Sequence, residues 1–287
     1  MAKSVTDKII DDAEKRIKEA YALRRKTILD ISAEYRRRGI VTFADMQKKG
    51  VYDEFVKRIN TELGILNSQT TSIIRGSTKG VYSESFYQSI FNIGQQASPE
   101  LLSSFNLIRP EVIERALANP LADFALARGN ADLKASINQG LAQSLIKGES
   151  YENMASRLND VMGGQVKNPM RVARTEGNRV VNVARMDAAH ESEEYGLEIS
   201  KEWIATLDDR TRDEHGAMDG EIVPLDDRFS NGLLYPGDPA GGPEWSINCR
   251  CTFKEIIKQS QKSTQRRYDG KIQEYKTYSE WRKDKGI

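Results

Sequence analysis

The stretch that decides the fold is NPMRVARTEGNRVVNVARMDAAHESEEYG, residues 168–196, because its spacing of apolar side chains is that of a long helix. At 100° per residue one face is apolar and another is basic. The apolar face holds Val172, Ala173, Val180, Val183 and Ala184, and the basic face holds Arg171, Arg174 and Arg185. Asn168-Pro169 is a typical helix start and Gly196 a typical stop. The stretch therefore predicts an amphipathic helix.

The chain before this helix also has helical spacing. Residues 4–38 predict one long helix, and residues 42–64 predict two short ones, the second stopped by Gly64. Residues 65–97 continue helical, with breaks expected at Gly76 and Gly80, and Ser98-Pro99 predicts a further helix start. Residues 119–150 predict two helices interrupted near Gly129-Asn130, and residues 150–164 predict one more, capped by Ser150.

After residue 197 the pattern changes from helical to mixed. LEISKEWIA, residues 197–205, alternates like a strand, and a turn with a short helix is expected over residues 206–220. Residues 221–225 predict a short strand, residues 229–248 a loop rich in Gly and Pro, and residues 249–257 a final strand. The tail, residues 259–287, is polar and basic, with a loose helix expected around Tyr275, Tyr278 and Trp281.

These patterns predict an α+β chain: a mainly helical N-terminal part followed by a compact α+β domain with a small sheet. The boundaries we expect are 1–134 for the helical region, 135–258 for the α+β domain and 259–287 for the basic tail. No stretch approaches the ~18 apolar residues of a membrane span, and the first residues lack the apolar block of a secretory signal. We therefore expect no membrane anchor.

Charge is distributed unevenly along the chain, although the net charge is only +1. Residues 1–185 carry a balance of +7, residues 186–253 a balance of −11, and residues 254–287 a balance of +5. An acidic segment therefore lies between two basic ones, which is typical of a protein with distinct interaction surfaces.

Both cysteines lie in the acidic segment, in SINCRCTF, residues 246–253. Cys249 and Cys251 are too close for a good disulfide, and reduced thiols are expected in a cytoplasmic compartment. In an extended strand both side chains would point to the same side. With His215 they offer three zinc ligands, and Asp208, Asp209, Asp213 or Asp219 could supply a fourth.

Two other interpretations of these residues remain open. The cysteines could be small buried core residues, with His215 hydrogen-bonded to a carboxylate. Alternatively, His215 among carboxylates could act as a general base, with a metal activating water in a hydrolase. Trp203 and Trp245 are expected to pack in the core of this domain.

Nucleic acid is a candidate partner for the basic parts. Arg171, Arg174 and Arg185 could contact phosphates, although an ion pair of Arg174 with a carboxylate is favoured. Arg266 and Arg267 in the tail are better candidates, beside Tyr and Trp side chains that could stack on bases. A solvated tail has the same composition.

The order of these motifs resembles the phage head morphogenesis family, the minor head proteins similar to phage Mu protein F. The matching stretches are VARTEGNRVVNVARMDAA, KEWIATLDDRTRDEHGAMDGEIVPLDDRF and LYPGDPAGGPEWSINCRCTF, and the resemblance covers about residues 135–258. The run of motifs includes Ala173 to Glu176, Trp203, Asp208-Asp209, Arg212, His215, Asp219-Gly220, Tyr235 to Gly237 and Asn248 to Cys251.

The resemblance implies a minor structural protein of a tailed phage, present in few copies and delivered with the DNA in some cases. It implies location in the capsid interior or at the portal vertex, and in the host cytoplasm during assembly. Expected partners are the portal protein, a scaffold or major capsid protein, and double-stranded DNA. It names no catalytic residue, so we expect no enzyme. The resemblance also favours the metal interpretation: one structural Zn²⁺ held by His215, Cys249 and Cys251, with Asp208 or Asp219 as a further ligand.

Overall fold

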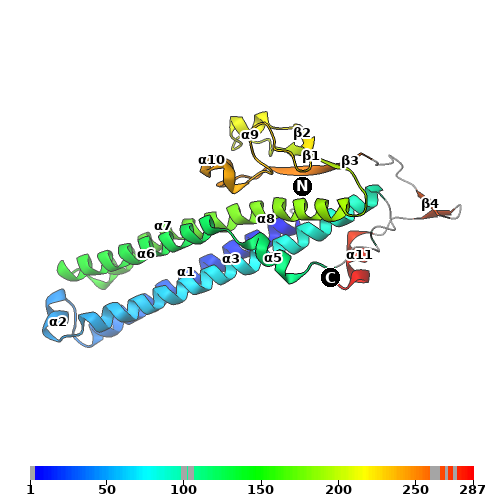
Figure 1. The fold of residues 1–287 in the computed structure, drawn as a ribbon. Helices are drawn as coiled ribbons and strands as arrows, with labels where there is room; N and C mark the ends of the chain where they lie inside the picture. Colours follow the sequence, from blue (N-terminus) through cyan, green and yellow to red (C-terminus); the bar gives the residue numbers. More distant parts are fainter. Residues whose placement is uncertain (1–3, 98–101, 103–106, 259–265, 269–270, 274–276) are drawn as a thin grey trace. The chain divides into compact units, whose positions relative to one another are not determined.

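The computed structural model describes residues 4–97, 102, 107–258, 266–268, 271–273 and 277–287. It describes only the backbone at 43, 151–152, 266–268 and 271–273. The predicted fold class is confirmed: a mostly helical region precedes a small antiparallel sheet with short helices (Figure 1). Contacts divide the chain into two compact units. The helical unit comprises Asp7–Ser77 and Asn119–Arg174, and the sheet unit comprises Met1–Thr6, Thr78–Ala118 and Thr175–Ile287. The predicted ranges 1–134, 135–258 and 259–287 rest on sequence patterns, whereas these units are defined by contacts. The predicted boundaries therefore stay a prediction.

The helical unit is built from amphipathic helices around one apolar core. Its helices are α1 (Val5–Arg37), α2 (Phe43–Lys48), α6 (Pro120–Ile146), α7 (Tyr151–Gln165) and the first parts of α3 (Tyr52–Ala97) and α8 (Lys167–Glu193). The core includes Ile17, Ile28, Phe55, Ile59, Ile137 and Leu158, each 0–1% exposed. Ser150 caps α7 as predicted, since its hydroxyl accepts a hydrogen bond from the Asn153 N–H at 3.3 Å.

The helix breaks predicted at four positions are wrong. Helix α3 runs through Gly64, Gly76 and Gly80, and α6 runs through Gly129-Asn130. A glycine inside a helix costs only about 1 kcal/mol relative to alanine, and burial on both sides of it outweighs this. At Gly129 the missing side chain also makes room, because a Cβ would lie 2.9 Å from Asn168 Nδ2. The helix start predicted at Ser98-Pro99 lies outside the described residues.

The sheet unit contains a three-stranded antiparallel sheet in the order β2-β1-β3. Strand β1 (Ile199–Ile204) is central, between β2 (Ile222–Pro224) and β3 (Thr252–Ile257), and Trp203 pairs with Phe253. The predicted strands and the short helix α9 (Asp213–Ala217) are confirmed. The predicted loop contains the short helices η1 (Pro239–Gly241) and α10 (Pro243–Ser246). Strand β3 is not the last, because β4 (Arg266–Tyr268) pairs with β5 (Lys271–Gln273).

The C-terminal helix α11 (Tyr278–Lys285) packs against the part of α3 that belongs to the sheet unit. Trp281 is buried, its ring lies 5.6 Å from that of Phe91, and its Nε1 donates to the Leu102 carbonyl at 3.2 Å. Arg282 pairs with Glu84 at 2.6 Å. The Trp281 ring is therefore not available to stack on bases, and Tyr275 lies outside the described residues. Helix α5 (Pro110–Leu117) completes this unit.

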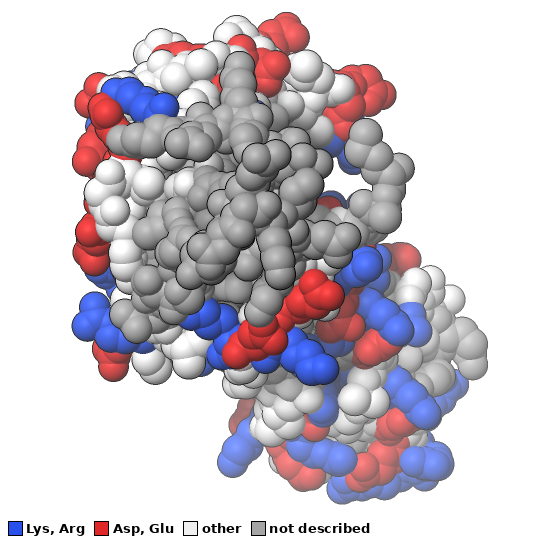
Figure 2. All heavy atoms as spheres, turned by 90° about the vertical axis from the view of Figure 1, so that its right-hand side faces the viewer, with Lys and Arg blue, Asp and Glu red and all other residues white. Residues whose placement is uncertain are grey.

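The described helices include none that combines the length and the apolar character needed to cross a membrane. On the face drawn in Figure 2, Lys and Arg side chains alternate with Asp and Glu side chains over the described surface. The described part of that face therefore carries no broad field of one sign.

A lysine occupies a core position of β1. Lys201 is fully buried, between Ile199 and Trp203 on the same face of the strand. Its Nζ donates to the Leu225 carbonyl and lies 5.4 Å from the centre of the Phe229 ring. Burial lowers the pKa of Lys201 from its ordinary value of 10.5 to about 8.

This lysine predicts a pH-dependent stability of the sheet unit. Between about pH 8 and 10.5, Lys201 is protonated in the unfolded chain but has lost its proton in the folded chain. The free energy of unfolding therefore rises with pH in that window. We expect a gain of at most about 3 kcal/mol relative to Lys201→Met. Urea unfolding followed by tryptophan fluorescence measures it, because all three Trp lie in the sheet unit. Parallel pH curves for the two proteins would contradict the prediction.

Candidate metal centre

His215 lies in α9 with its ring fixed on both sides. It is 3% exposed, and the Trp245 ring stacks on it with centroids 4.6 Å apart and planes inclined by 20°. Its Nε2 lies 3.1 Å from the Glu244 carbonyl oxygen. Because a carbonyl oxygen only accepts, Nε2 carries the proton and donates it, which leaves a lone pair on Nδ1.

Both cysteines turn toward that lone pair. The Sγ atoms of Cys249 and Cys251 lie 3.7 and 3.5 Å from His215 Nδ1, and both thiols are buried and free of disulfides. The two cysteines come just before β3, after Asn248, whose φ of 54° makes it the one non-glycine with positive φ among the described residues. The structure thus brings three predicted ligands together, within 4.8 Å of one another.

The spacing of these three atoms fits a tetrahedral ion. Zn–S bonds of ~2.3 Å and Zn–N bonds of ~2.0–2.1 Å at tetrahedral angles place sulfur and nitrogen about 3.6 Å apart, close to the 3.5 and 3.7 Å observed. A single lone pair on Nδ1 can accept only one thiol proton, whereas a metal would use all three donor atoms. The buried group can therefore hold a metal ion.

The electrostatics of the pair favour a thiolate at one sulfur. The pKa of Cys251 is lowered first by the hydrogen bond that the Cys249 thiol donates to its sulfur. The pKa of Cys249 is raised by its hydrogen bond to Cys251 and by burial. Thiolate is the form that binds metals.

The carboxylates proposed as a fourth ligand lie elsewhere. Asp208 pairs with Arg250 at 2.5 and 2.6 Å, and hydrogen bonds from that guanidinium hold the pKa of Asp208 well below its usual range. Asp219 accepts the Ala205 N–H at 2.8 Å. Asp209 and Asp213 are exposed. Within the described part of the chain the metal-capable group has three members, and Asp208 is not one of them.

The loop that carries the cysteines is instead held by other residues of the motif. Arg212 donates to the Ile247 carbonyl at 3.0 Å, and Thr206 donates to the Arg250 carbonyl at 2.9 Å. The Thr175 hydroxyl accepts the Asn248 N–H at 3.2 Å. These three bonds tie the backbone of a loop that has no regular structure to the residues around it.

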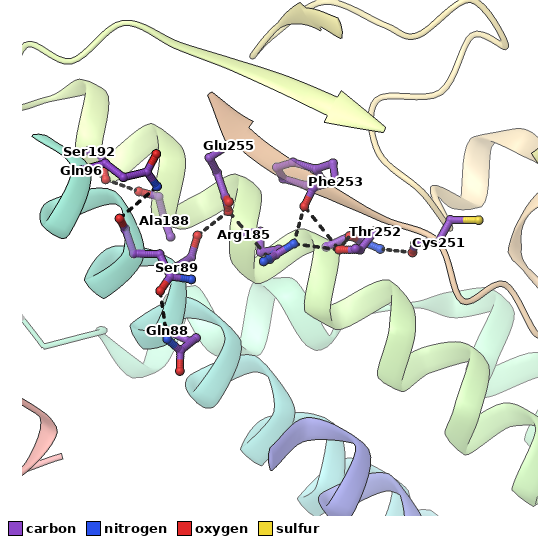
Figure 3. Close-up of polar contacts among 12 residues, drawn as sticks. Gln88, Ser89, Gln96, Arg185, Ala188, Ser192, Cys251, Thr252, Phe253 and Glu255 are labelled. Atoms are coloured by element: carbon purple, nitrogen blue, oxygen red, sulfur yellow. Dashed lines mark hydrogen bonds and ion pairs between the residues drawn. The ribbon is translucent and has the colours of Figure 1, made fainter. Parts of the chain in front are cut away.

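The basic face is predicted for residues 168–196. In the part of α8 that belongs to the sheet unit, side chains on this face donate hydrogen bonds to β3 and to the loop that carries the cysteines. Asn178 and Asn182 donate to the Cys251 carbonyl at 3.1 and 3.2 Å. Figure 3 shows Arg185 aimed at β3, where it donates to Thr252 Oγ1 at 3.0 Å and to the Phe253 carbonyl.

Figure 3 also shows the buried Glu255, which lies 3.8 Å from Arg185 and accepts a hydrogen bond from Ser89. Sequence reasoning missed the asparagines, although their spacing of four residues on this face was a usable signal.

The other residues predicted to contact nucleic acid have varied surroundings. Arg171 donates to Asn168 at 2.6 Å. Arg174 pairs with Glu14 at 2.7 Å, which is the favoured ion pair with a carboxylate. Arg266 and Arg267 lie in β4, and their side chains lie outside the description. Nucleic-acid contact by Arg171, Arg174, Arg185, Arg266 and Arg267 stays a prediction.

Comparison with known proteins shows which proteins this chain resembles. Residues 135–254 match the family described as "Phage Mu protein F like protein". That segment is similar to this family, and the predicted resemblance is confirmed.

Among curated proteins, the chain is 28% identical over 294 residues to Minor head protein GP7 of Bacillus phage SPP1, across 97% of this chain and 94% of that protein. The chain is thus similar, over nearly its whole length, to a phage minor head protein.

Two further relatives are longer than this chain. NAD(+)--arginine ADP-ribosyltransferase EFV of Enterococcus faecalis is 27% identical over 238 residues, across 79% of this chain and 48% of that protein. An uncharacterized protein of Haemophilus influenzae is 28% identical over 141 residues, across 46% of this chain and 29% of that protein. The chain therefore aligns with less than half of either relative. No solved structure matches the chain.

The bonds from α8 predict that Asn182→Leu loosens the candidate metal centre. Asn182 is fully buried and also donates to the Pro236 carbonyl at 2.8 Å. A leucine of similar size therefore removes the donor to the buried Pro236 carbonyl and leaves Asn178 alone to donate to the Cys251 carbonyl. We expect a loss of about 2–3 kcal/mol in the stability of the sheet unit. We also expect faster reaction of both cysteines with a thiol reagent.

Asn178→Ala is the matched control, because Asn178 donates to the same Cys251 carbonyl but is only half-buried, so water can replace it. Its effect should be smaller in both measurements. Equal effects of the two substitutions, or unchanged thiol reactivity in Asn182→Leu, would refute this role.

Proposed function

We propose that this chain is a minor head protein of a tailed phage that acts in head assembly and in packaging or delivery of DNA, bound near the portal. The observation that carries this proposal is the similarity to a phage minor head protein across 97% of this chain and 94% of that protein. The Mu F-like match over residues 135–254 agrees with it. The partners proposed are the portal protein and a scaffold or major capsid protein, and the place is the capsid interior or the portal vertex.

We further propose that the cysteines and His215 hold one structural Zn²⁺. The three donor atoms are buried, their spacing suits a tetrahedral ion, and the proton on Nε2 is held by a backbone carbonyl. The surrounding module has short strands and long loops, so a metal would supply folding free energy that regular structure does not. None of the described carboxylates belongs to this group, so the proposal names no fourth ligand.

A metal-dependent hydrolase centred on His215 is a weaker proposal. His215 is 3% exposed, and both of its ring nitrogens already have partners. A general base needs a proton within reach on a bound substrate. The proposal is therefore a non-enzymatic protein, and turnover that is lost in His215→Ala with the fold intact would overturn it.

The portal assignment predicts a stable complex. Co-expression with the portal protein of the same phage should give a complex in which this chain elutes with the portal oligomer in size-exclusion chromatography. Procapsids assembled with it should contain few copies per particle. Elution of this chain only as free protein, together with its absence from purified procapsids, would refute the proposal.

The metal assignment predicts about one zinc per chain by elemental analysis of freshly purified, reduced protein. Cys249→Ser/Cys251→Ser should lose the zinc and lower the melting temperature of the sheet unit, and a strong chelator should do the same to the wild type. Asp208→Asn is the control: it breaks the ion pair with Arg250 but should keep the zinc. Metal-free protein of unchanged stability would make the cysteines simple core residues.

A further inference from the structure

One end of the helical unit carries a cluster of exposed cations. Helix α1 ends there at Arg37 and α2 at Lys48, and α6 ends beside them at Ile146. The cluster, called the basic tip, comprises Arg36, Arg37, Arg38, Lys48, Lys49 and Lys147, all exposed.

The parts of the basic tip are joined by direct contacts. Lys49 Nζ donates to the Arg38 carbonyl at 3.2 Å. Side chains from the ends of α1 and α6, and from α2, line one small cavity, among them Arg36, Met46 and Leu145. Met46 and Leu145 are 1% and 3% exposed, so the exposed cations surround buried apolar side chains.

Few carboxylates neutralise the basic tip. Residues 36–50 contain five Lys or Arg and one acidic residue, Asp45. Asp53 and Glu54 follow in the first turn of α3, but neither makes an ion pair with a cation of the tip among the described residues. Asp45 accepts hydrogen bonds in the capping box of α2. Arg38 lies 3.9 Å from Glu34, which has a closer partner in Arg58 at 2.8 Å.

The neighbouring acidic residue at the end of α6 is also engaged, since Glu149 pairs with Arg157 at 2.6 Å. Arg36, Arg37, Lys48 and Lys147 make no ion pair with any residue that the structure describes.

The carboxylates at this end respond to the cations around them. The pKa of Glu34 is lowered first by its hydrogen bond to Arg58 and then by charges that include Arg37. The pKa of Asp45 is lowered by hydrogen bonds from Thr42 and by the charge of Lys49.

Helix ends alone do not account for this cluster. A helix C-terminus favours a cation in its last turn, and three helices end here. One cation for each end would satisfy that preference, whereas the basic tip has six. None of the exposed side chains described at the tip is aromatic, so the described residues offer no platform for stacking on unpaired bases.

We propose that the basic tip binds the phosphate backbone of double-stranded DNA. Duplex DNA presents a dense row of phosphates that exposed Lys and Arg neutralise without reading sequence. The surface differs from the residues predicted from sequence, and the inference does not depend on the minor head assignment. It places the DNA contact in the helical unit.

The test compares two variants of the full chain that lose the same charge. Arg36→Gln/Arg37→Gln/Lys48→Gln removes three cations of the tip, and Lys8→Gln/Lys15→Gln/Lys18→Gln removes three exposed cations elsewhere on α1. Fluorescence anisotropy with a labelled duplex of about 30 base pairs, from about 50 to 200 mM KCl, gives affinity and salt dependence. Circular dichroism checks that both variants keep the wild-type helix content.

The tip variant should bind the duplex at least about tenfold more weakly at low salt. The slope of log affinity against log salt concentration should be less steep by up to about 2.7, because three phosphate contacts are lost. The control variant should bind like the wild type. An unchanged tip variant, or an equal loss in the control, would overturn the proposal. Displacement of the duplex by poly-L-glutamate at equal anion concentration would also overturn it, because the tip would then suit acidic proteins equally well.

Discussion

The carbonyl of Cys251 is the point on which the sheet unit depends. Two asparagines of α8 donate to it, and one of them, Asn182, also holds the Pro236 carbonyl. One face of α8 thereby donates hydrogen bonds to backbone carbonyls in two loops that have little regular structure of their own. Because an unpaired buried carbonyl is costly, these loops have few alternatives to the course they take. The position of both sulfurs relative to His215 follows from that course.

Much of the fold could be predicted because it depends on local patterns. The spacing of apolar residues located α1 and α8, the alternation in residues 197–205 located β1, and Ser150 located the start of α7. The breaks predicted at Gly64 and Gly129 failed for a non-local reason: packing on both sides keeps a helix intact across a residue that favours its end. A sequence displays the glycine but not that packing.

The candidate site shows the same division. Residue chemistry alone named His215, Cys249 and Cys251, which the structure brings together. The role of Asp208 was not accessible in this way, because it depends on Arg250, a residue forty-two positions away. Arg185 looked like a solvent-facing cation, since a polar helix face normally meets water. Its partners on β3 are themselves polar, so the face is covered without being apolar.

Helix α11 bears on the order in which the protein is made. Its contacts reach back 198 residues, from Arg282 to Glu84, and 179 residues, from Trp281 to Leu102. During synthesis the aromatic side chains near Phe91 must therefore wait for the last residues of the chain before they are covered. Exposed apolar surface is what makes partly made chains aggregate. A ribosome that stalls shortly before Trp281 would release a sheet unit with that strip of α3 uncovered, which is a hazard that a chain with local contacts avoids.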